Sequence, residues 1–64
     1  MGAFADLLAE CTTLTEGAHV SFRYSPSLPP TKQWRALSAG EVGTGRTGEE
    51  SLRTLVEALR VRPA

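Results

Sequence analysis

The stretch AHVSFRYSPSLPPTKQWRALSAG, residues 18–40, decides the fold. Apolar and polar side chains alternate from Ala18 to Tyr24, and the alternation resumes from Gln33. A period of two is typical of a strand that is buried on one face. Three prolines in residues 25–31 remove backbone donors, so the first strand must end there. The stretch therefore predicts two strands joined by a proline-rich loop.

The residues that follow predict a hairpin. Ala39 and Gly40 fit a tight turn, because Gly40 tolerates a positive φ angle. Residues 41–44 add a short strand around Val42 if the pattern continues, so the sheet has two or three strands.

An amphipathic helix is expected on each side of the strands. In residues 3–14 apolar side chains recur at helical spacing, namely Phe4, Leu7, Leu8, Cys11 and Leu14. The last segment repeats this spacing in Leu52, Leu55, Val56 and Leu59, after a capping box formed by Thr47 and Glu50. The order α-β-β-(β)-α predicts an α+β fold with two helices on one face of a small antiparallel sheet.

Size and charge limit what the chain can do. Its 64 residues fit one domain, residues 1–64, whose core is marginal alone, so we expect self-association or a protein partner. Seven basic residues balance seven acidic ones, which excludes nucleic-acid binding by bulk charge alone. One Cys and one His leave no internal disulfide and too few ligands for a Cys/His zinc site.

Nothing in the sequence indicates export or a membrane. Asp6 and Glu10 interrupt the apolar positions of the N-terminal helix, which is the wrong pattern for a secretory signal. No uncharged apolar run approaches the roughly 18 residues of a membrane span. We expect a cytoplasmic protein without a cofactor. Six arginines against one lysine indicate a GC-rich genome and favour a bacterial or phage origin.

The alternation gives the predicted sheet one basic face. The helix-facing set is Val20, Phe22, Tyr24, Trp34 and Ala36. The opposite set includes His19, Arg23 and Arg35, with Lys32 at its margin. Residues 18–40 carry a charge of +3 and no acid, whereas residues 1–17 carry −3. Such a face can bind an acidic partner or RNA phosphates, or it can be an ordinary solvated face.

Residues 43–48, GTGRTG, match the G-x-G-x-x-G spacing of a dinucleotide site. The chain has no parallel strand after them and no acidic residue about 20 positions on, so dinucleotide binding is excluded. A flexible turn before a helix cap explains the glycines, and an anion contact by Arg46 is the alternative.

Catalysis has no support in the sequence. Cys11 lies on the apolar face of the first helix, away from His19, so no Cys–His nucleophile pair is expected. We interpret Cys11 as a small buried apolar residue and Trp34 as the main anchor of the core. No enzyme activity, catalytic residue or metal site is expected.

Two families share features with the chain. Residues 34–59, WRALSAGEVGTGRTGEESLRTLVEAL, resemble the HicB-like antitoxin domain, in which a strand runs into a G-x-T-x-E-E helix start. Ser51 departs from the Ala usual there. The order α-β-β-β-α is similar to that of a double-stranded-RNA-binding domain, whose last helix starts with a Lys-rich cluster. Glu49 and Glu50 reverse that charge, which argues against the family's RNA activity.

These observations favour a non-enzymatic protein-binding or regulatory module, antitoxin-like or phage-encoded. The alternative is a nucleic-acid-binding module that uses the basic face of the sheet. Both hypotheses assign the contact to the same residues, which are His19, Arg23, Lys32 and Arg35.

Overall fold

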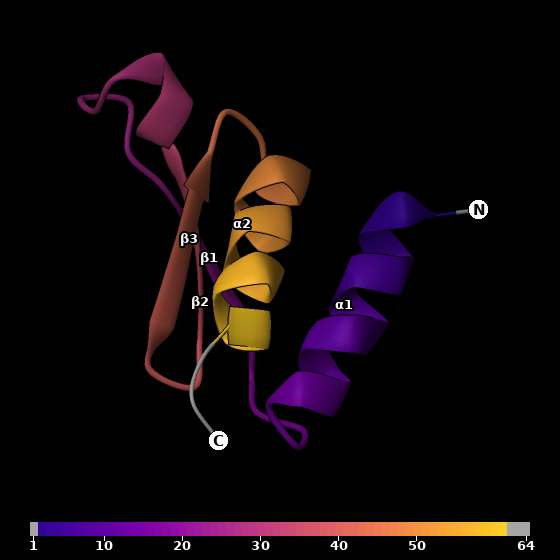
Figure 1. Cartoon of the computed structure of the whole chain (residues 1–64). Helices are drawn as coiled ribbons and strands as arrows, with labels where there is room; N and C mark the ends of the chain where they lie inside the picture. The colour runs from indigo at the N-terminus through magenta and orange to yellow at the C-terminus, as the bar shows by residue number, and fades with distance from the viewer. Residues whose placement is uncertain (1, 62–64) are drawn as a thin grey trace.

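The chain folds into two helices and a three-stranded antiparallel sheet (Figure 1). The structure is a computed structural model that describes residues 2–61. Its elements are α1 (Ala3–Leu14), β1 (Ser21–Tyr24), the short 3-10 helix η1 (Pro30–Lys32), β2 (Trp34–Ser38), β3 (Glu41–Gly45) and α2 (Gly48–Val61). The strand order is β1-β2-β3. The predicted α+β architecture is confirmed, and residues 41–45 form the third strand.

The strand register places the two predicted sets of side chains on opposite faces. On the helix side the cross-strand partners are Phe22 with Ala36 and Tyr24 with Trp34, and on the other side they are Ser21 with Leu37 and Arg23 with Arg35. Because side chains alternate along a strand, a shift of one residue would reverse both sets. The observed register therefore confirms the division of the strand residues that the alternation predicts.

Ala39 and Gly40 form the predicted tight turn between β2 and β3. Ser38 and Glu41, which flank it, are direct partners in the sheet. The φ angles are 51° at Ala39 and 81° at Gly40, as in a type I′ turn. Gly40 adopts such an angle freely, whereas the Cβ of Ala39 makes the left-handed conformation strained.

Two glycines of β3 let α2 pack directly on the strand. A Cβ at Gly43 would lie 2.2 Å from the backbone nitrogen of Leu55 and 2.3 Å from the carbonyl oxygen of Ser51. A Cβ at Gly45 would lie 2.7 Å from the Ser51 nitrogen. Gly43 and Gly45 are buried strand residues, so interpreting them as a flexible turn was wrong. They permit a close approach of helix and strand backbones.

The core lies between the helices and the helix side of the sheet. Its buried apolar members are Cys11, Ala36, Leu52, Leu55, Val56 and Leu59. Four of the six belong to α2, so this helix is the main anchor of the core. Trp34 is only half-buried and contacts the Tyr24 ring at a centroid distance of 5.2 Å. Interpreting Trp34 as the main anchor was therefore wrong.

Helix α1 is attached mainly through α2. Figure 1 shows α2 between β3 and α1. The carboxylate of Glu10 accepts a hydrogen bond from the Arg60 side chain of α2. At the other end of α1, the Phe4 ring lies 5.7 Å from the ring of Phe22 in β1, measured between centroids. Both helices thus lie on one side of the sheet, and the opposite side is left to solvent.

Candidate functional site

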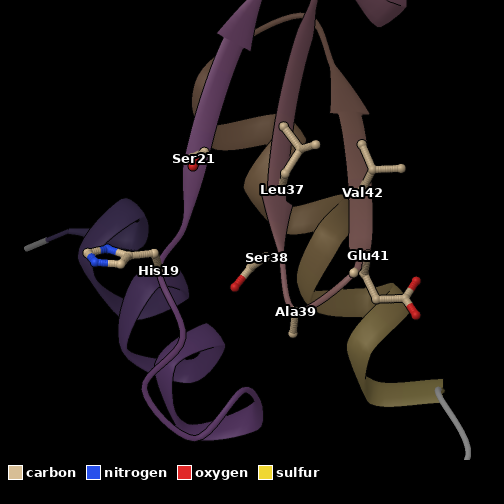
Figure 2. A pocket seen from close by; sticks show the side chains of 8 residues that line it. His19, Ser21, Leu37, Ser38, Ala39, Glu41 and Val42 are labelled. Carbon is tan, nitrogen blue, oxygen red and sulfur yellow. The ribbon is translucent and has the colours of Figure 1, made fainter.

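One side of the sheet is covered by neither α1 nor α2. Figure 2 looks onto this side, with α2 behind the strands and α1 behind the segment that leads into β1. The side chains that face it form two rows across the strands. The leucine row consists of Ser21, Leu37 and Val42, and the arginine row consists of Arg23, Arg35 and Thr44. We call these six residues the open face.

The leucine row gives the open face an apolar part. Leu37 of β2 and Val42 of β3 are direct cross-strand partners. Val42 is 48% exposed, and Leu37 is half-buried although no helix lies over it. Directly opposite side chains lie about 4.5–5.5 Å apart at Cβ, so these two form one apolar surface.

The arginine row brings two like charges together. Arg23 lies directly opposite Arg35 in the register, and the third member of the row, Thr44, carries no charge. Within residues 2–61 the ion pairs are those of Arg53 with Glu49 and of Arg60 with Glu10, and neither involves this row. Like charges directly opposite one another destabilise a sheet. A bound anion would relieve that repulsion.

Arg35 occupies the middle of the sheet and is half-buried. Its Nε is buried and has no hydrogen-bond partner in the described part of the chain. An incompletely satisfied polar group of this kind costs free energy unless another group supplies an acceptor. The buried Nε without a partner distinguishes Arg35 from an ordinary solvated arginine.

The structure separates the other two predicted contact residues from the arginine row. Lys32 is exposed in η1, beyond the end of the sheet where Tyr24 pairs with Trp34. His19 is exposed and precedes β1 at the opposite end. Of the four predicted contact residues, only Arg23 and Arg35 are neighbours in the sheet, while His19 and Lys32 lie at its two ends.

His19 lines a shallow hollow beside the β2–β3 turn (Figure 2). The hollow has a volume of about 480 Å³ and is lined by His19, Ser21, Leu37, Ser38, Ala39, Gly40, Glu41 and Val42. It continues the leucine row, whose three members all line it. Strand pairing between β1 and β2 starts at Ser21 and Leu37, which leaves the preceding residues apart from β2. The sequence pattern missed the hollow because it does not show where strand pairing starts.

Arg46 lies at the N-terminus of α2, where a carboxylate is already present. Glu50 Oε1 accepts a hydrogen bond from the backbone N–H of Arg46 at 3.0 Å. Thr47 Oγ1 accepts one from the Glu50 backbone N–H, also at 3.0 Å. One half of the predicted capping box is therefore present: Thr47 caps the Glu50 N–H, but the Glu50 side chain accepts from Arg46 rather than from Thr47. The acidic group stands where a bound anion would lie. The anion contact by Arg46 stays a prediction.

The remaining reactive side chain is Cys11, which is fully buried as predicted. Burial raises the pKa of the Cys11 thiol, and the side chain of Ser38 offsets part of that increase. Among residues 2–61 no three His, Cys, Asp or Glu side chains gather as metal ligands. In the same part of the chain, no helix has the length and apolar character needed to cross a membrane.

No protein-family model, curated protein or solved structure matches this chain. The resemblances to the HicB-like antitoxin domain and to the double-stranded-RNA-binding domain therefore stay predictions from the sequence. The open face and its charges are the basis for assigning a function.

Proposed function

We propose that the chain is a non-enzymatic module that docks a protein partner on the open face. The observation that carries this proposal is the combination, on one uncovered side of the sheet, of the leucine row and the arginine row. A sheet is apolar on the face that it buries, and a chain of 64 residues has a small core. A partner that binds the open face and buries Leu37 and Val42 would therefore also stabilise the fold.

The side chains of the open face favour a protein over a nucleic acid. Sheets that bind single-stranded nucleic acid stack the bases on aromatic side chains of their exposed face. Here Tyr24 and Trp34 pair on the helix side. The open face carries two cations, Arg23 and Arg35, which is few for phosphate binding. A nucleic-acid-binding module is the second candidate, since unpaired arginines also suit phosphates.

The finer aspects of the proposal rest on the sequence alone. A regulatory, antitoxin-like role follows from the resemblance of residues 34–59, and a phage or bacterial origin and a cytoplasmic location follow from composition. The partner is either a second copy of the chain or another protein. The open face is the surface that we assign to either partner.

Site-specific photo-crosslinking in living cells tests the proposal. Benzoylphenylalanine replaces Val42, which is exposed on the open face. In a matched control it replaces Glu57, which is exposed on α2 on the other side of the sheet. We expect a protein adduct from position 42 and none from position 57. Equal adducts from both positions, or adducts with nucleic acid in place of protein, would contradict the proposal.

A further inference from the structure

The positive charges of the open face have no acidic residue beside them in their row. Arg23 and Arg35 lie directly opposite one another, and Thr44 completes their row. Glu41, the acidic residue of β3, pairs with Ser38 in a helix-side row. It lines the hollow at the turn end of the leucine row, not the arginine row. The arginine row therefore combines two guanidinium groups with no carboxylate, and its complement is an anion from another molecule.

A carboxylate suits this pair because of the geometry of guanidinium groups. Each guanidinium presents planar N–H donors that match the two oxygens of a carboxylate. Arg35 is half-buried, so its side chain has less freedom to lose on binding than that of a fully exposed arginine. Its buried Nε has no partner within the described residues. A carboxylate that lies between two guanidinium groups is therefore bound more strongly than a carboxylate at a single exposed arginine.

The spacing of the two rows specifies the rest of the ligand. Leu37 follows Arg35 by two positions on β2, which corresponds to about 6.6 Å along the strand. In an extended segment, side chains two positions apart point to the same side at the same spacing. When an acidic residue of such a segment lies over the arginine row, the segment's side chain two positions away lies over Leu37 and Val42. An apolar residue fits there.

A second copy of the chain fits the open face poorly. A two-fold axis parallel to the strands would place each arginine row on its own symmetry mate, and a two-fold axis across the strands would place it on the leucine row of the other copy. In the first arrangement four guanidinium groups would meet, and in the second the arginines would face apolar side chains. In neither would a residue of the open face supply a carboxylate. Charge complementarity therefore favours a different, acidic chain.

We propose that the open face binds an extended acidic segment of a partner protein, in which an acidic residue and an apolar residue stand two positions apart. The carboxylate lies between Arg23 and Arg35, and the apolar side chain lies on Leu37 and Val42. This inference rests on the proposed function, since it names the partner chemistry of the same surface.

Titration of the ¹⁵N-labelled full chain with capped synthetic peptides tests the inference. The probe peptide alternates Glu, Ser, Val and Ser, and the control peptide has Lys in place of Glu. We expect the probe to shift the amide signals of β1, β2 and β3, and the Lys peptide to leave them in place. The combined substitutions Arg23→Gln and Arg35→Gln should weaken binding by about tenfold or more. Arg53→Gln, which removes one positive charge from α2, away from the open face, should leave the affinity unchanged.

The other outcomes are equally informative. Equal binding of the Glu and Lys peptides, no shift with either peptide, or full affinity of the double variant with an unchanged circular dichroism spectrum would overturn the inference. A protein adduct from position 42 would keep the proposed function standing in each case. Binding of a single-stranded oligonucleotide to the open face, with no binding of either peptide, would overturn both proposals.

Discussion

Arg60 of α2 donates a hydrogen bond from Nε to Glu10 of α1, and this ion pair joins two residues that are 50 positions apart. The Arg60 guanidinium holds the pKa of the Glu10 carboxyl below its ordinary value of 4.5. Cys11 is the residue of α1 that is fully buried, whereas Leu7 and Leu8 are half-buried. The pair therefore supplements a modest apolar contact between the two helices.

The first prediction concerns pH. Because the pKa of Glu10 is lower in the folded than in the unfolded chain, the ion pair stabilises the fold above pH 4.5. This contribution is lost as the pH falls through the folded-state pKa. We expect Glu10→Gln to lower the free energy of unfolding at neutral pH and to have a smaller effect in acid. Urea unfolding at a series of pH values measures the difference.

A double-mutant cycle provides the control for this prediction. Arg60→Gln should destabilise the fold at neutral pH, and adding Glu10→Gln should cause little further loss, because each change breaks the same ion pair. The coupling between the two substitutions should decrease as the pH falls. A coupling that does not depend on pH would contradict the assignment of the pKa shift to this pair.

The second prediction concerns the contact between α2 and β3. Gly43→Ala should destabilise the fold by about 3 kcal/mol or prevent folding, because the new methyl group meets the backbone of Leu55 at 2.2 Å. Gly48→Ala is the matched control. Its Cβ would meet the Trp34 ring at 3.9 Å, an ordinary contact, so the stability should stay the same or rise by up to about 1 kcal/mol. Similar urea midpoints for the two variants would contradict the predicted clash.

The third prediction concerns the β2–β3 turn. Ala39 has a φ of 51°, and Asn followed by Gly is the preferred sequence of a type I′ turn. Ala39→Asn should therefore stabilise the fold by about 1 kcal/mol. Ala39→Val should destabilise it, since a branched side chain tolerates a positive φ poorly. Thermal unfolding monitored by circular dichroism measures both changes. A stabilising Ala39→Val would contradict the assigned turn.

The sequence predicts the features of this fold that depend on one segment alone, and it misses those that depend on contacts between distant segments. The period-two alternation predicts that Arg23 and Arg35 lie on the same face, because side-chain direction follows from each strand alone. Their direct pairing depends on the strand register, which the alternation does not give. The role of Gly43 was missed, since it depends on contact with Leu55. The ion pair of Glu10 with Arg60 depends on how two distant helices pack, which neither helical pattern contains.

The candidate site divides in the same way. The alternation assigns His19 to the same face as Arg23, but it does not show that β1 starts only at Ser21. Lys32 belongs to η1, a short 3-10 helix that no periodic pattern predicts. The hollow beside His19 follows from the point where two strands separate. These features depend on where elements end, which is where local patterns carry least information.

The last prediction separates stability from binding at the arginine row. Arg23→Thr removes one of two like charges that lie directly opposite one another, so it should stabilise the isolated chain by about 0.5 kcal/mol. The gain should shrink as salt screens the repulsion. Arg53→Thr, which breaks the ion pair with Glu49 on α2, should not stabilise the chain. Urea unfolding at low and high salt measures both effects. A loss of stability in Arg23→Thr would show that Arg23 serves the fold rather than a partner, whereas a gain marks a residue better suited to binding than to folding.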